Sequence, residues 1–494
     1  MPAQGLNYDL ATSLKLLRLS LFSIINESSF PVALFFELAL IARALPRENL
    51  AAYAAISATC TFVLNIFNFL VTVTMAQVSK AVGGNDWRNV GRQFLIAVLT
   101  AIFVGTACAF ALFYLREHVF YIMGLSESVQ NIAATPYNIR LITIPFMMVQ
   151  RVCSGCLSGY MRLKSLASLA VVVSIVEVFS QFYALEVLRG GLLEATIGRL
   201  VTSIFGSVLA MVLVVLLPPE RAQGAIEICQ CCHRRQSTEK ENSELLSTVL
   251  LDDGDETETG GNCTETFVEY FTASRDTTIR SVLLTGSVYA MSVVAGNLGT
   301  DALAAHQIVL TLWMVTSYFC DGFADVGTML GAKLLAGSDP GKFKQVIVLR
   351  NLLLLYGIST GLVAGLVLFA FEDDIFTLFH VHDGHTKDLL ILVWPILSFM
   401  QIINACVFVL DGLIYAAQAF SFVRNLMFVA CVLVFSPAIF VVTTVSAYHS
   451  LFYLWIGKTC LNSVRAVGAF WLWFYSFPSS WRSERRVNSA PPIG

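Results

Sequence analysis

The stretch "LGTDALAAHQIVLTLWMVTSYFCDGF" at residues 298–323 begins like a turn and continues as a long apolar run that carries polar residues. A weaker copy, "LPRENLAAYAAI", lies 253 residues earlier at residues 45–56. The same offset relates the turn at 84–86 to that at 337–339. Turns kept in register over such a distance indicate two structural repeats rather than chance similarity between apolar sequences.

Proline and glycine positions extend the repeat. Nearby offsets pair Pro145 with Pro395 and Gly155 with Gly412. Random apolar sequence readily matches Leu and Ala, but it does not keep prolines and glycines in order over several segments. The repeat is therefore expected to cover most of both halves.

The composition indicates an integral membrane protein. The chain has 494 residues, of which 56% are hydrophobic and 13% charged, and its mean hydropathy is +0.71. A soluble chain of this length needs more charge to cover its surface. The net charge of −3 and the dispersed basic residues give no indication of nucleic-acid binding.

Twelve segments are long and apolar enough to span a bilayer as helices, which takes about 20 residues. We expect these helices near residues 13–42, 50–76, 94–115, 137–160, 166–188, 195–217, 276–297, 302–331, 347–370, 389–414, 425–445 and 451–475. The predicted fold is thus all-α, with two six-helix lobes at 13–217 and 276–475. Since six crossings are even, the repeats are parallel and their axis runs along the membrane normal.

Loop charges predict the orientation. One set of loops and both tails carry more Lys and Arg than the opposite loops, so the positive-inside rule places both termini (1–12 and 476–494) in the cytosol. The segment 218–275 is acidic and poor in aromatic residues, and its composition is typical of a disordered linker. Its "CQCCH" cluster at 229–233 is interpreted as reduced thiols in a loop, with lipidation and metal binding as the alternatives.

Four motifs resemble a known family: "LGTDALAAHQI" at 298–308, "YFCDGFADVGTMLGAKLLAGSD" at 318–339, "LDGLIYAAQAFSFVRN" at 410–425 and "YNIRLITIPF" at 137–146. They resemble segments of multidrug and toxic compound extrusion (MATE) proteins, especially the DNA-damage-inducible protein F (DinF) branch. The resemblance implies a cation-driven antiporter that exports organic, often cationic, compounds.

Carboxylates within the apolar segments of the first half are candidates for cation coupling, because ionisable groups in membrane helices are costly and usually face a cavity. They are Glu27 and Glu37 in the first segment and Glu177 in the fifth, where Gln181 follows at i+4 on the same helical face. The resemblance suggests that Glu37 lies near the family's coupling aspartate. The alternatives are an interfacial pair of Glu37 with Arg43 and a helix break at Glu27 before Pro31.

Polar residues of the second half are interpreted as structural. Asp321, Asp325 and Asp411 lie near predicted cytosolic helix ends and are expected to form gate contacts with bases such as Lys333 or Arg424. His306 and Gln307 are expected to tie the top of the eighth helix to its neighbours. Thr300 or Asp301 is expected to cap that helix after a turn at Gly299.

The predicted function is alternating-access export of a small organic substrate in exchange for protons, with Na⁺ as the alternative ion. A lipid-linked flippase of the same superfamily is the second alternative, although it should have a cationic cavity for a pyrophosphate and the basic residues lie mostly in the predicted loops. A membrane-embedded enzyme is disfavoured because no catalytic constellation is visible, and a receptor is disfavoured because that class does not predict the 253-residue repeat. We expect no cofactor or metal, a monomer within the lipid bilayer, and a location in the plasma membrane or an organelle membrane.

Overall fold

The computed structural model describes residues 10–217 and 263–476, apart from 124, 126, 337–339, 380 and 382–383. Regular structure in these residues is entirely helical. The α-helices are α1 (Leu10–Ala44), α2 (Arg47–Ile66), α3 (Phe69–Gly83), α4 (Trp87–Tyr114), α5 (Arg116–Ile122), α6 (Glu127–Gly159), α7 (Leu163–Phe182), α8 (Leu192–Leu216), α10 (Cys263–Asn297), α11 (Thr300–Leu335), α12 (Pro340–Ala370), α13 (Glu372–Leu378), α14 (His385–Ala416), α15 (Phe420–Val429), α16 (Ser436–Thr444) and α17 (Leu451–Trp471).

These helices form twelve membrane spans, as predicted. Ten stretches within the described residues are long and apolar enough to cross a membrane, and the long helices α1 and α17, which are not among those ten, match the first and the twelfth predicted segments. Two spans are built from two α-helices each. The second breaks at Phe67 and Asn68 between α2 and α3, and the eleventh joins α15 to α16 through the π-helical segment Ala430–Phe435. The short helices α5 and α13 were not predicted.

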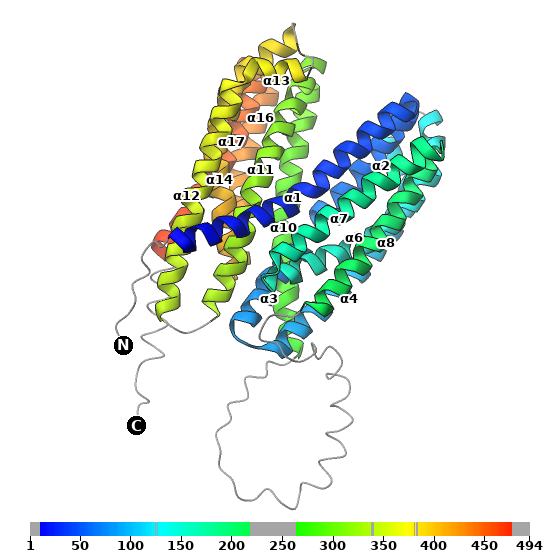
Figure 1. Cartoon of the computed structure of the whole chain (residues 1–494). Coiled ribbons are helices and arrows are strands. Elements are labelled where there is room, and N and C mark those ends of the chain that lie inside the picture. The colour runs from blue at the N-terminus through cyan, green and yellow to red at the C-terminus, as the bar shows by residue number, and fades with distance from the viewer. Residues whose placement is uncertain are drawn as a thin grey trace, which may run out of the picture.

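The twelve spans divide into an N lobe (α1–α8) and a C lobe (α10–α17). Figure 1 shows that the helices of the two lobes diverge toward one end of the molecule and approach each other at the other end. We call the end at which α8 stops and α10 begins the linker face, and the opposite end the far face. The lobes touch near the linker face, where a Cβ on Gly83 of α3 would collide with the backbone of Lys333 in α11.

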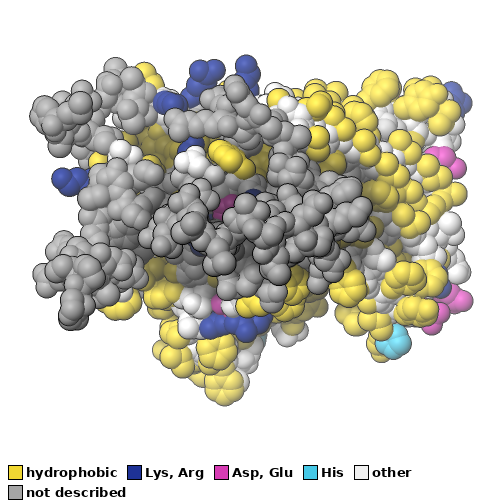
Figure 2. Space-filling model, turned by 90° about the horizontal axis from the view of Figure 1, so that it is seen from below, with side chains coloured by type: hydrophobic (Ala, Val, Ile, Leu, Met, Phe, Trp, Pro, Cys, Tyr) yellow, Lys and Arg dark blue, Asp and Glu magenta, His cyan; other side chains and the backbone are white. Residues whose placement is uncertain are grey.

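The flanks of the molecule are apolar and exposed, as expected of surfaces that contact lipid. Large side chains such as Phe103, Phe369 and Leu433 are more than 60% exposed. Figure 2 views the molecule from the linker face, with hydrophobic side chains along the flanks and Lys and Arg side chains at several places on the face itself. This distribution matches a bilayer-embedded body with a charged end.

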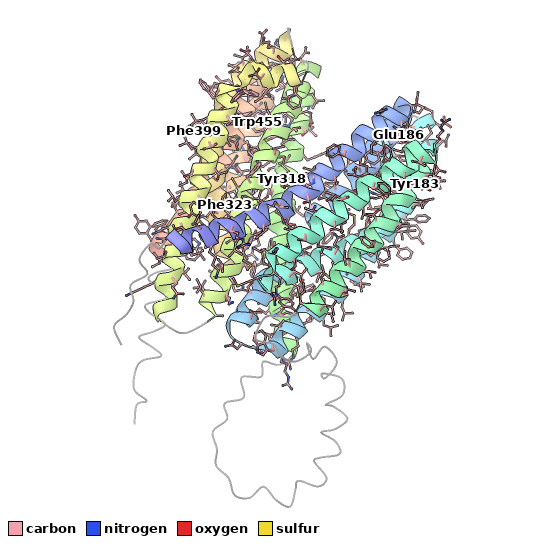
Figure 3. All side chains as sticks on the ribbon, in the orientation of Figure 1. Tyr183, Glu186, Tyr318, Phe323, Phe399 and Trp455 are labelled. Atoms are coloured by element: carbon pink, nitrogen blue, oxygen red, sulfur yellow. The ribbon has the colours of Figure 1, made fainter. Side chains whose placement is uncertain are left out.

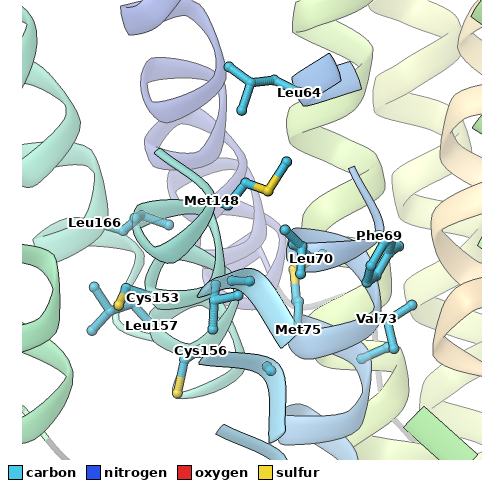
Figure 4. Packing of buried hydrophobic residues seen from close by; sticks show 14 of the residues in the cluster. Leu64, Phe69, Leu70, Val73, Met75, Met148, Cys153, Cys156, Leu157 and Leu166 are labelled. Atoms are coloured by element: carbon cyan, nitrogen blue, oxygen red, sulfur yellow. The ribbon is translucent and has the colours of Figure 1, made fainter. Parts of the chain in front are cut away.

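The hydrophobic core is continuous across the lobe junction. One cluster of buried side chains fills the N lobe and includes Val326, Leu353 and Leu413 from the linker-face half of the C lobe. Part of it, around Leu70 and Met148, is drawn in Figure 4. A separate cluster, with Trp394 and Trp455, fills the far-face half of the C lobe. The lobes therefore share apolar packing near the linker face.

Equivalent glycines confirm the repeat at the level of contacts. A Cβ on Gly155 of α6 would lie 2.7 Å from the carbonyl oxygen of Val71 in α3. The carbonyl oxygen that a Cβ on Gly412 of α14 would strike belongs to Ala324 in α11, 253 residues after Val71. Both lobes use the same close helix approach, which only a glycine permits at these two positions.

The first helix of each lobe crosses to the other lobe. The N-terminal part of α1 contacts the C lobe, because the Tyr356 hydroxyl donates to the carbonyl of Ser13 at 3.2 Å and the Ser23 hydroxyl donates to Asp325 at 2.8 Å. Further along α1, the Ser174 hydroxyl of α7 donates to the carbonyl of Ser29 at 3.2 Å, within the N lobe. Figure 1 shows this diagonal course of α1.

Helix α10 makes the reciprocal crossing. At its start, Tyr270 lies 3.1 Å from the Thr74 hydroxyl and Glu269 lies 2.8 Å from Lys80, both in α3 of the N lobe. Nearer its middle, Arg280 binds Asp411 of the C lobe at 3.0 Å. The parallel repeat thus extends to an exchange of helix ends between the lobes.

Two local expectations need correction. Gly299 has the predicted positive φ of 123° and is itself the N-cap of α11, so Asp301 lies in the first turn of the helix and not at its cap. Asp301 accepts from the Thr386 hydroxyl at 2.8 Å instead. The linker is also shorter than expected, since α10 begins at Cys263; the cluster at 229–233 lies outside the described residues.

Candidate functional site

A buried charge cluster joins the two carboxylates that the sequence singled out in the N lobe. Arg199 of α8 binds Glu37 of α1 at 2.8 Å and also contacts the carboxylate of Glu177 in α7. All three side chains are at most 6% exposed. Three helices of one lobe are therefore tied to a single guanidinium, whose planar fork can serve two carboxylates at once.

A second base balances the charge of the cluster. Arg140 of α6 is 4% exposed and lies within electrostatic reach of Glu37. Gln181 follows Glu177 by one turn and donates to the carbonyl of Ala195 in α8 at 3.0 Å, so it links α7 to α8. Two carboxylates and two guanidiniums leave the cluster formally neutral.

The alternative reading of Glu37 as an interfacial acid paired with Arg43 is wrong. Glu37 is 1% exposed, whereas Arg43 is 81% exposed and lies 3.7 Å from Glu186 near the far face. Figure 3 shows Glu186 at that end of the N lobe. Burial of a carboxylate beside two arginines is a property of a built site rather than of a surface.

A second polar group lies where α1 crosses α11. Asp325 accepts from Ser23, and Asp321 lies within electrostatic reach of Glu27. Arg151 of α6 lies within reach of Glu27 and donates to Asn68 at 3.1 Å. This group, rather than contacts to Lys333 or Arg424, is the setting of the two aspartates, and Figure 3 places Tyr318 at the same crossing.

Helix α1 runs without a break past Glu27. Pro31 has no N–H to bond the carbonyl of Glu27 four residues earlier, and the Glu27 side chain accepts from Asn26 at 2.8 Å. Glu27 therefore does not cap a helix break. It lies between the lobes, near Asp321 and Arg151.

The C lobe holds a chain of hydrogen bonds that ends at Asp411. Asp411 is 4% exposed and accepts from Arg465 of α17 at 2.7 Å and from Arg280 of α10 at 3.0 Å. The expected partner Arg424 binds Asp276 at 2.6 Å instead. From Arg465 the chain continues through Asn462, Asn404 and Gln401 to Thr316, with donor–acceptor distances of 3.3, 2.7, 3.4 and 2.7 Å.

His306 and Gln307 have different surroundings. His306 is fully buried, with its Nε2 3.2 Å from the Ser292 hydroxyl of α10 and its ring 5.6 Å from the Trp455 ring of α17. It joins three helices as expected. Gln307 is exposed, so the expectation that it ties α11 to its neighbours is wrong. The next helical position simply faces outward.

Sequence reasoning missed the buried bases. Arg140, Arg199, Lys458 and Arg465 are each at most 4% exposed, although bases were expected mostly in loops. Each stands inside a long apolar segment, which is the same signal that drew attention to the acids. The repeat offers a further clue, because Arg199 and Lys458 both occupy the eighth position of the sixth helix of their lobe.

The arrangement suits ion and solute binding better than bond-making chemistry. Within the described residues no group of three His, Cys, Asp or Glu side chains could hold a metal ion. The polar clusters consist of carboxylates, guanidiniums and amides joined across helices of one lobe or at the lobe junction. Such groups can exchange partners when helices move, which is what a carrier needs.

Comparisons with known proteins agree with this architecture. The MatE family model matches residues 23–182 and 277–440, one segment in each lobe. DNA damage-inducible protein F of Escherichia coli (strain K12) is 24% identical over 381 residues, covering 76% of this chain and 74% of that protein. Protein DETOXIFICATION 42 of Arabidopsis thaliana is 29% identical over 197 residues, which is 39% of this chain and only 36% of that relative's length.

The fold is also found in solved structures. A crystal structure of MATE in the bent conformation superposes with a TM-score of 0.79 at 13% identity, covering 95% of this chain and 96% of that one. Identity this low supports the fold alone. Because the family model matches most of both six-helix lobes, this chain belongs to the MatE family, and its long apolar helices make it a multi-pass membrane protein.

Proposed function

We propose that this protein exports small organic compounds in exchange for protons, by alternating access between the two lobes. The observation that carries the proposal is the shared contact of Arg199 with Glu37 and Glu177. A proton bound to either carboxylate leaves Arg199 with one charged partner instead of two. Because the three residues lie on α1, α7 and α8, that change alters the contacts between the helices that line the N lobe.

The lobe arrangement supports alternating access. Contacts between the lobes gather near the linker face, and the helices diverge toward the far face. Loop bases such as Lys80, Arg162 and Lys344 lie at helix ends of the linker face, so we propose that this face is cytosolic. In that orientation the lobes are closed toward the cytosol and part toward the opposite side.

The proposed test measures efflux of ethidium, a flat organic cation, from vesicles that contain the purified protein. Efflux is driven by an imposed proton gradient in one arm and by a sodium gradient in the other. Glu37→Gln and Glu177→Gln remove titration but keep size and hydrogen bonding. We expect proton-driven efflux in the unaltered protein and its loss in at least one variant that still binds ethidium.

A matched control is Glu186→Gln, which removes a carboxylate at the far face outside the cluster. It should transport like the unaltered protein. Normal pumping by both Glu37→Gln and Glu177→Gln would move the coupling site elsewhere, with the group at Glu27, Asp321 and Asp325 as the next candidate. Efflux under the sodium gradient alone would identify the other coupling ion.

A further inference from the structure

The two lobes differ in how they compensate the positive charge of a buried base at equivalent positions of their sixth spans. In the N lobe, Arg199 contacts two carboxylates. In the C lobe, Lys458 stands at the matching position of α17 and is 1% exposed. The titratable groups within its electrostatic reach are Arg465, Arg280 and the thiol of Cys431, and none of them is a carboxylate. The C lobe therefore has a base at the matching position, but no carboxylate within its electrostatic reach.

Hydrogen-bond donors without acceptors gather around Lys458. Its Nζ lies 5.0 Å from the ring centre of Trp313 in α11, and neither Lys458 Nζ nor Trp313 Nε1 has an acceptor among the described residues. Trp455, one turn earlier in α17, also has an unpaired and buried indole N–H. A buried donor without an acceptor costs free energy, and a buried ammonium without a counter-charge costs more.

The neighbouring acid does not supply the missing charge. Asp411 binds Arg465 and Arg280 through the same oxygen, Oδ2, and is absent from the groups within electrostatic reach of Lys458. Lys458, Asn462 and Arg465 follow one another at i, i+4 and i+7, so they share one face of α17. This face therefore carries two basic side chains and one amide, whereas the one nearby carboxylate, Asp411, is already shared between Arg465 and Arg280.

We propose that the C lobe has an anion-binding site at Lys458, in which an anionic group accepts from the lysine ammonium beside the indole of Trp313. A carboxylate of an organic acid and a small inorganic anion share this chemistry. The aromatic wall and the positive cluster exclude a simple metal cation from the same position. The proposal concerns binding and does not depend on proton coupling in the N lobe.

The test is calorimetric titration of the purified full-length protein with succinate, with chloride, and with tetraphenylphosphonium as a cationic comparison. Lys458→Met removes the charge and keeps the side-chain length, while Lys458→Arg keeps the charge. The matched control is Lys344→Met, at an exposed lysine of α12. Charge-assisted hydrogen bonds of this kind predict a loss of about tenfold or more in anion affinity for Lys458→Met.

We expect Lys458→Arg and Lys344→Met to bind the anion like the unaltered protein. Succinate binding that chloride does not displace identifies an organic acid as the ligand, and displacement by chloride identifies a site for inorganic anions. Unchanged affinity in Lys458→Met, or no binding of either anion to the folded protein, overturns the proposal. Failure of proton-driven efflux would leave these titrations unaffected.

If Lys458→Met fails to fold, the unaltered protein still decides the matter. Iodide quenches tryptophan fluorescence and is itself an anion, so the site predicts a saturable component of quenching that succinate or chloride removes. Trp313→Phe should abolish that component. Quenching that is linear in iodide and insensitive to both competitors would show that no anion reaches Lys458.

Discussion

Removing Arg199 is predicted to destabilise the N lobe strongly. The substitution Arg199→Met leaves Glu37 and Glu177 buried at 1% and 5% exposure, with Arg140 still within electrostatic reach of Glu37. Breaking a buried ion pair by deleting one partner costs about 3–5 kcal/mol, because the other charge stays buried without compensation. Since about 1.4 kcal/mol is a factor of ten, the ratio of folded to unfolded protein should fall by roughly 100-fold or more.

The assay is reversible unfolding of the purified protein in mixed micelles, followed by tryptophan fluorescence. The triple variant Glu37→Gln, Glu177→Gln, Arg199→Met removes all three charges and should recover much of the loss, since neutral replacement of a buried network is often tolerated. The matched control is Arg43→Met, which deletes an 81% exposed partner of a surface pair and should change stability by less than about 1 kcal/mol. If Arg199→Met unfolds like Arg43→Met, or if the triple variant is no more stable than the single one, the cluster is not the buried network described.

Three further outcomes are expected. His306→Ala should destabilise the protein by about 1–3 kcal/mol, seen as a lower thermal unfolding midpoint, because its contacts to Ser292 and Trp455 are lost. Gln307→Ala, at the exposed neighbour, should leave the midpoint unchanged. A stable His306→Ala protein with altered substrate affinity would instead make His306 a site residue. Gly412→Ala should destabilise the protein by about 1–3 kcal/mol, since the added methyl group would collide with the backbone of Ala324. Gly286→Ala, at a glycine with open space around it, should leave stability unchanged or increase it. Equal unfolding midpoints for the two variants would contradict the close helix approach. Deletion of residues 226–260, before α10 begins, should leave ethidium efflux near its full value, because that segment has too few apolar residues to form a hydrophobic core. Loss of efflux at normal membrane abundance would reveal a regulatory role of the segment.

The fold was predictable because its signals are local and periodic. Twelve apolar segments gave twelve spans, and the turn at Gly299 with its copy at Pro46 located the start of the matching helices α11 and α2. The interruption at Phe67 and Asn68 was not predictable, since no Gly or Pro marks it and apolar residues continue on both sides. Hydropathy indicates whether a segment can cross a membrane, but not where the backbone hydrogen bonds of its helix are interrupted.

The site was predictable only in part. A carboxylate in a membrane helix is costly, which makes Glu37 and Glu177 candidates from the sequence alone, but their partner Arg199 lies on a helix that begins 155 residues after Glu37. Pairing of this kind depends on packing, which one sequence does not reveal. The same limit explains why Asp411 was assigned to Arg424, a neighbour along the chain, when packing gives it Arg280 and Arg465.

The exchange of α1 and α10 between the lobes has a mechanical consequence. Each helix is anchored to both bodies, so any change in the angle between them must be absorbed as bending within the two helices. Between its anchors at Ser23 and Glu37, α1 contains Pro31, at which a helix can bend. Helix α10 contains no proline, and its Gly286–Ser287 pair lies beyond its anchors at Tyr270 and Arg280. The two crossing helices are therefore unequal, and a change in the angle between the lobes is expected to bend α1 more than α10. Because α1 carries Glu37, this bending acts directly on the buried charge cluster.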